Sequence, residues 1–214
     1  MRKYFILFLV LNTTSLYALF GGLGINVLQD QFEIPAQENE MIEGIGAVFS
    51  TTVVENPIGV GVFVYLTAIP KIDLEAGYNI SFSKYKYAYA DTDELELGIG
   101  KGTWYASLQY PFFSPPTFRM YAGLGANGTK WISVVDTNTL TKLDEENVDL
   151  NNEDALLEAL LQEVSGYHVE LGARFKPPVI PWSFNFNARY NFVKDFYTDI
   201  DNYLTLSAGL AFAI

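Results

Sequence analysis

The sequence predicts an all-β protein: an eight-stranded antiparallel up-and-down transmembrane β-barrel, with a short helix in its third extracellular loop. The closing stretch, residues 201–214, alternates between an apolar face and a face of small and polar residues, as the last strand of such a barrel does. Seven further stretches alternate similarly. The connections between them are short and proline-bearing on one side and polar on the other, an asymmetry that a soluble β-sandwich has no reason to keep.

The first 18 residues have the features of a secretory signal peptide. Arg2 and Lys3 precede an apolar run over residues 4–11, and Ala18 is a small residue at the expected cleavage point. The run is much shorter than the ~20 residues that a membrane-spanning helix needs. We therefore expect residues 1–18 to be removed on export and residues 19–214 to form one outer-membrane barrel domain.

The first four strands follow from alternation and from turn residues. A glycine-rich strand over residues 19–28 leads into an acidic connection. A strand over residues 58–67 ends at a tight proline turn, and the strand after it, over residues 72–88, alternates most clearly. The fourth covers residues 95–110, and its alternation slips near Gly100–Gly102, where we expect a glycine-marked bulge.

The last four strands complete the odd–even pattern. They cover residues 118–130, 166–176, 182–193 and 201–214. Proline-bearing turns follow the second, fourth and sixth strands, whereas polar connections follow the first, third, fifth and seventh, and two of these are long. Both termini then lie on the short-turn side, which is the periplasmic side in an outer-membrane barrel.

The long connection Ser133–Val164 is the least barrel-like part of the chain. Between Asp136 and Glu163 it holds nine acidic residues against the single base Lys142. A helix is predicted over Ala155–Val164, because acidic and Asn residues precede it and apolar residues recur at helical spacing. This stripe packs on the barrel mouth or binds an extracellular protein or ligand, and it comprises Leu156, Leu157, Leu160, Leu161 and Val164.

The alternation assigns the apolar faces of the strands to lipid and the polar faces to the lumen. Aromatic side chains near the strand ends are expected to form two interfacial girdles: Tyr110, Phe118, Phe175 and Trp182 at the turn side, and Tyr78, Trp104, Trp131, Tyr167 and Phe192 at the loop side. Charged inward side chains require partners, so we expect a lumen polar network of Asp73, Glu75, Arg119, His168, Glu170, Arg174 and Arg189.

With these features the chain resembles the small eight-stranded outer-membrane barrels of Gram-negative-type bacteria, the class that includes the OmpA transmembrane domain, OmpX and OmpW. The resemblance covers residues 19–214 and rests on the architecture and the closing strand. It implies outer-membrane lipid and the barrel-assembly machinery as partners. Members of the class typically end in an aromatic residue, whereas here Phe212 lies two residues before the terminal Ile214.

These features favour a structural or surface-interaction role, with a plugged polar lumen and acidic extracellular loops over residues 29–56 and 133–164. An eight-stranded barrel has a lumen about wide enough to be filled by side chains. The alternative is a narrow, porin-like channel or small-solute carrier.

A remote alternative is an outer-leaflet lipid hydrolase built on His168, the only histidine, with Ser165 nearby in sequence. Too few catalytic roles can be assigned for an enzyme to be expected.

Composition excludes several other classes. The formal net charge of −12 disfavours nucleic-acid binding, which requires a basic surface. The chain has no cysteine and a single histidine, so neither a disulfide framework nor a zinc site is expected. We expect no cofactor and no metal.

Overall fold

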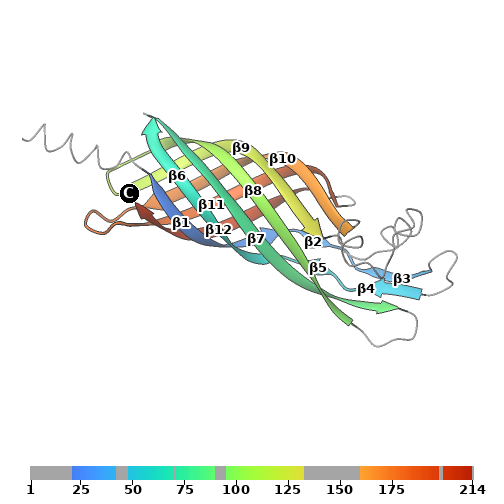
Figure 1. The fold of residues 1–214 in the computed structure, drawn as a ribbon. Coiled ribbons are helices and arrows are strands. Elements are labelled where there is room, and N and C mark those ends of the chain that lie inside the picture. Colours follow the sequence, from blue (N-terminus) through green and yellow to red (C-terminus); the bar gives the residue numbers. More distant parts are fainter. Residues whose placement is uncertain are drawn as a thin grey trace, which may run out of the picture.

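The computed structural model describes residues 21–41, 48–69, 71–89, 95–132, 160–197 and 200–213. Within these residues eight strands close into a ring (Figure 1). Each pairs antiparallel with the next ring strand along the chain, and the first pairs with the last. The predicted eight-stranded antiparallel barrel is confirmed. The ring strands are β1 (Gly22–Gln31), β6 (Ile58–Ile69), β7 (Ile72–Tyr89), β8 (Leu95–Phe113), β9 (Phe118–Ile132), β10 (Leu161–Phe175), β11 (Trp182–Tyr197) and β12 (Ile200–Ala213).

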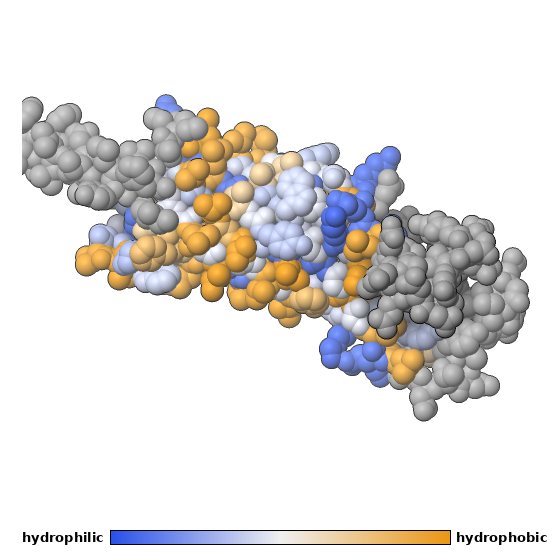
Figure 2. All heavy atoms as spheres, in the orientation of Figure 1, coloured by the Kyte–Doolittle hydropathy of each residue, from blue (hydrophilic) through white to orange (hydrophobic). Residues whose placement is uncertain are grey.

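The barrel is polar inside and apolar outside. Outward side chains form an apolar belt on the barrel. Figure 2 shows part of this belt as orange surface on the face in view. Because every ring strand is paired on both sides, backbone groups are satisfied within the wall, as a hydrocarbon environment requires. Among the described residues no helix is both long and apolar enough to cross a bilayer. The belt includes Ile25, Val27, Val60, Val62, Val64, Leu108, Leu124, Val169, Leu171, Phe184 and Phe186.

The predicted acidic connection between the first two ring strands contains further strands. β2 (Glu33–Ile34) pairs with β5 (Val54–Glu55), and β3 (Gln37–Met41) pairs with β4 (Val48–Thr51). β4 also pairs with the outer end of β7, so the sheet continues beyond the belt (Figure 1). There Lys84 and Glu96 form an exposed ion pair in which the Lys84 ammonium donates a hydrogen bond to the Glu96 carboxylate. This hydrogen bond raises the pKa of Lys84 and lowers the pKa of Glu96.

The expected bulge at Gly100–Gly102 is wrong. The ladder runs without interruption through Lys101, which pairs with Ser81 on one side and Trp131 on the other. The hydrophobicity pattern slips because small glycines face outward while a charged lysine faces inward, but the backbone alternation holds. Register shifts occur instead where strands approach their ends, as between Pro111 and Phe113 and between Phe192 and Tyr197.

The predicted helix over Ala155–Val164 is wrong for its last four residues. Residues 161–164 belong to β10 and pair with the end of β9, from Leu161 opposite Ile132 to Val164 opposite Thr129. A cross-strand ion pair between Lys130 and Glu163, with an N–O distance of 3.0 Å, stabilises this extension. Residues 155–159 lie outside the described residues, as does the predicted signal peptide over residues 1–18.

Candidate functional site: the filled lumen

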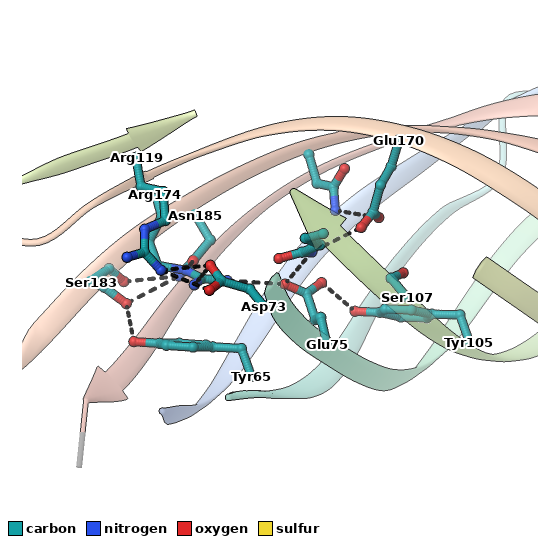
Figure 3. A network of polar contacts seen from close by, with 12 residues as sticks. Tyr65, Asp73, Glu75, Tyr105, Ser107, Arg119, Glu170, Arg174, Ser183 and Asn185 are labelled. Carbon is teal, nitrogen blue, oxygen red and sulfur yellow. Dashed lines mark hydrogen bonds and ion pairs between the residues drawn. The ribbon is translucent and has the colours of Figure 1, made fainter. Parts of the chain in front are cut away.

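The lumen contains an ion network that begins next to the short turns. Arg119 on β9 donates to both carboxylate oxygens of Asp73 on β7, at 2.7 and 2.8 Å. Arg174 on β10 lies 3.6 Å from Asp73 and 3.3 Å from Glu75, so it links the first acid to the second (Figure 3). Arg174 also donates to Asn185 on β11 at 2.7 Å. These contacts connect four ring strands, β7, β9, β10 and β11, across the interior.

The network continues toward the middle of the barrel through Glu170 and Arg189. Arg189 lies 3.0 Å from Glu170 and 3.6 Å from Glu75. Gln109 bridges the two glutamates, donating to Glu170 at 2.8 Å and to Glu75 at 3.2 Å. Tyr105 donates to Glu75 at 3.2 Å. The two buried carboxylates therefore share several donors, which offsets their desolvation.

Formal charge balances within this network. The three arginines Arg119, Arg174 and Arg189 face three acids, and all but Arg119 are buried. Two of the guanidinium groups also stack on aromatic rings, Arg174 at 3.6 Å from the Tyr65 centroid and Arg189 at 3.5 Å from that of Tyr105. In a buried ion network with matched charges, loss of one member leaves the charge of its partner uncompensated, so each member depends on the others.

His168 lies next to the network and bonds to a serine that the sequence reasoning did not select. Its Nε2 atom is 2.8 Å from the Oγ atom of Ser107 on β8, and both residues are buried. Ser165 lies on the opposite, outward face of β10. The serine–histidine pair of this structure therefore faces the lumen, away from lipid.

We accordingly predict that the purified protein releases no fatty acid from outer-membrane lipid. Mass spectrometry of the lipids after incubation with the wild-type protein and with His168→Ala checks this. A deacylated product that forms with the wild type and disappears with His168→Ala would contradict the prediction.

A second polar layer lies closer to the loop end. The buried Lys101 of β8 forms an ion pair with Asp30 of β1 at 2.7 Å. Asp30 also accepts hydrogen bonds from Ser81 at 2.8 Å and Thr205 at 2.6 Å. Asn191 donates to Thr205 at 3.0 Å and so connects β11 to this cluster. Neither Lys101 nor Asp30 was predicted as a lumen residue, and the inward alternation of their strands was the signal that could have identified them.

A buried hydrophobic cluster rich in aromatic side chains, here called the aromatic cap, lies in the barrel interior above this layer. Phe196 lies in its centre, with ring centroids 5.2 Å from Phe32, 5.1 Å from Trp131 and 5.3 Å from Tyr203. Lys101 contacts the cap from below, with its Nζ atom 4.0 Å from the Tyr203 centroid. The cap comprises Phe32, Ile34, Val54, Tyr85, Ile99, Trp131, Val193, Phe196 and Tyr203.

The cap corrects one predicted girdle position. Trp131 points inward and is buried in the cap, whereas the girdle residues Tyr78, Trp104 and Tyr167 are exposed on the outer face. The β2–β5 pair contributes Ile34 and Val54, so the connection between β1 and β6 folds over the barrel mouth.

The predicted leucine stripe is divided by the structure. Leu161 faces outward on β10 and is exposed, whereas Val164 faces inward and packs against the aromatic cap. Leu160 is buried. Leu156 and Leu157 lie outside the described residues. Helical spacing therefore does not hold at the end of the stripe, where strand geometry places neighbouring residues on opposite faces.

A small cavity lies beside the ion network. An internal cavity between Glu75, Tyr121 and Asn187 has a volume of about 10 Å³, close to that of one water molecule. A hollow of about 590 Å³ lies instead on the outer, apolar surface across β11, β12, β1, β6 and β7. In the part of the chain that the structure describes, no cluster of His, Cys, Asp and Glu has the make-up of a metal site.

Comparison with solved structures identifies the architecture. The chain is similar to Neisserial surface protein A, with a TM-score of 0.53 and 15% identity over 91% of this chain and 97% of that one. It is also similar to Ail, the attachment invasion locus protein of Yersinia pestis, solved in complex with the heparin analogue sucrose octasulfate. That match has a TM-score of 0.50 and 11% identity, and it covers 90% of this chain and 96% of Ail.

The fold is that of a small bacterial outer-membrane β-barrel. No protein-family model matches the sequence, and neither does any curated protein. The similarity is therefore one of architecture, and a specific role must be argued from this chain's own residues.

Proposed function

We propose that this protein resides in the outer membrane as a closed barrel and has a structural or surface-interaction role, exerted through its loop end. The observation that carries the proposal is the filling of the lumen. The ion network, the Asp30–Lys101 layer and the aromatic cap follow one another from the turn end to the loop end. A lumen occupied in this way favours a role outside the barrel over transport through it.

The loop end is the part suited to a partner. The β3–β4 hairpin and the outer end of β7 extend the sheet past the apolar belt, into the space where extracellular loops lie in such barrels. The two longest connections are rich in acidic residues. Ail was solved with a sulfated sugar analogue, but acidic loops favour a partner with a basic surface over a polyanion. We also expect the barrel-assembly machinery to insert the chain.

Conductance across a planar lipid bilayer tests the closed lumen. We expect the folded wild-type protein to produce no stable open current, because the ion network, the Asp30–Lys101 layer and the aromatic cap all occupy the lumen, and the cavity beside Glu75 has a volume of only about 10 Å³. A stable open current that changes in Arg119→Ala or Glu75→Ala would overturn the proposal and support the alternative, a narrow channel or small-solute carrier. A boiling-dependent shift in gel mobility verifies that each sample is folded.

A further inference from the structure

Two neighbouring turns at the turn end of the barrel expose apolar side chains in an unusual way. Phe112 and Phe113, at the end of β8, are both 52% exposed although they are consecutive. Val179 and Ile180, between β10 and β11, are 92% and 48% exposed. Consecutive residues of a strand normally face opposite sides, so exposure of both marks a surface beyond the regular wall. These four residues are called the turn patch.

The turn patch is held in place by its backbone. The amide of Lys176 donates to the carbonyl of Thr117 at 2.8 Å, which joins the two turns. The amide of Ala213 donates to the carbonyl of Pro181 at 2.7 Å, which fixes the second turn to β12. Six of the nine prolines lie in residues 111–116 and 177–181 and restrict the backbone further. The backbone that carries the turn patch is therefore restrained at both turns.

The turn patch continues the apolar belt. Phe175, Trp182 and Phe212 are exposed at the adjoining strand ends, and the Trp182 and Phe212 rings contact each other at 5.4 Å. Figure 2 shows hydrophobic surface reaching this end of the barrel, at the left of the view. The surface that contacts lipid and the surface of the two turns are thus contiguous.

The charges at this end are basic. The stretches 66–72, 110–119 and 175–183 contain no aspartate or glutamate, although the whole chain has a net charge of −12. Lys71, in the turn between β6 and β7, is exposed, and Lys176, at the start of the turn between β10 and β11, is half-buried. Asp73, the first acid after the stretch 66–72, points into the lumen and binds Arg119. A basic and apolar surface next to a lipid-facing belt is complementary to anionic lipid headgroups.

We propose that the turn patch is a lipid-interface anchor: Phe112, Phe113, Val179 and Ile180 insert among phospholipids, and Lys71 and Lys176 bind their anionic headgroups. The inference rests on the proposed function in one respect: it takes the outer membrane as the membrane and its periplasmic leaflet as the lipid layer at the turn end. It gives the two proline turns a role in setting the depth of the barrel. The experiment must distinguish insertion of these residues into lipid from docking of a periplasmic protein on them.

A single cysteine labelled with an environment-sensitive fluorophore tests insertion, because the chain has no native cysteine. Val179→Cys is compared with Glu55→Cys, an exposed position at the loop end, in the full-length protein folded into phospholipid vesicles. We expect several-fold weaker quenching by iodide on both sides of the membrane at position 179, and strong quenching by lipids brominated near the headgroup. Equal iodide quenching at the two positions would overturn the anchor and leave the patch free for a protein.

Headgroup binding has a separate readout. Lipid quenching at position 179 should be stronger in phosphatidylglycerol vesicles than in phosphatidylcholine vesicles, and Lys71→Gln with Lys176→Gln should remove the difference. Equal quenching in both lipids would overturn the role of the lysines. The boiling-dependent mobility shift verifies barrel folding in every sample, so a failed anchor is distinguishable from a failed barrel. Ile180→Cys replaces Val179→Cys if that variant does not fold.

Discussion

Replacing Arg189 with leucine should destabilise the barrel folded in lipid by about 3–5 kcal/mol, the range found when one partner of a buried ion pair is removed. Arg189 is buried between Glu170, at 3.0 Å, and Glu75, at 3.6 Å. Without it Glu170 retains hydrogen bonds from Gln109 and Asn187, but no other cation of the described residues lies within an ion-pair distance of it. Guanidinium-dependent folding into lipid vesicles measures the loss.

The matched control is the exposed pair Lys130–Glu163, which has the same 3.0 Å separation. Lys130→Leu should change stability by at most about 1 kcal/mol, because exposed ion pairs contribute little. The double substitution Arg189→Leu with Glu170→Leu should recover most of the loss, since it removes both charges together. Equal effects of Arg189→Leu and Lys130→Leu would show that the interior charges do not depend on pairing.

Truncating Phe196 to alanine should destabilise the loop end of the barrel by about 3–5 kcal/mol, the range for a buried phenylalanine. Phe196 contacts Phe32, Trp131 and Tyr203 in the aromatic cap. The β2–β5 pair depends on the cap through Ile34 and Val54. Hydrogen exchange should therefore accelerate at the amides of β2 and β5 while the ring strands stay protected.

Phe186→Ala is the control for the cap, because Phe186 is on the same strand but faces outward. Its truncation should leave exchange at β2 and β5 unchanged, since it removes no contact inside the lumen. Unchanged exchange at β2 and β5 in Phe196→Ala would mean that the connection folds over the mouth without the cap.

The strands and their faces could be predicted because a two-residue period is a local property of the chain. Belt residues such as Val60 and Leu171 are exposed, and Glu75 and Arg189 are buried, on the faces that alternation assigns to them. The limits of the strands were less predictable. β10 begins before its predicted first residue, and β11 continues beyond its predicted last residue. In both cases a neighbouring strand continues the ladder, and such a partner is not visible in the local pattern.

The cap was missed because hydrophobic contrast disappears above the belt. Inward residues such as Trp131 and Phe196 are as apolar as outward ones, so alternation no longer distinguishes the two faces. Asp30 was assigned to an acidic connection and Lys101 to a bulge, because the two residues are 71 positions apart in sequence and neither has a local partner.

The sequence by itself thus determined the barrel, the side of the wall on which most residues lie, and the acids and arginines that enter the lumen. Only the tertiary structure decided which of them pair, that Asp30 meets Lys101, and that an aromatic cluster gathers at the loop end. The reason is physical: the face of a strand residue depends on its immediate neighbours, whereas an ion pair or an aromatic contact across a lumen depends on where the closure of the ring places distant strands.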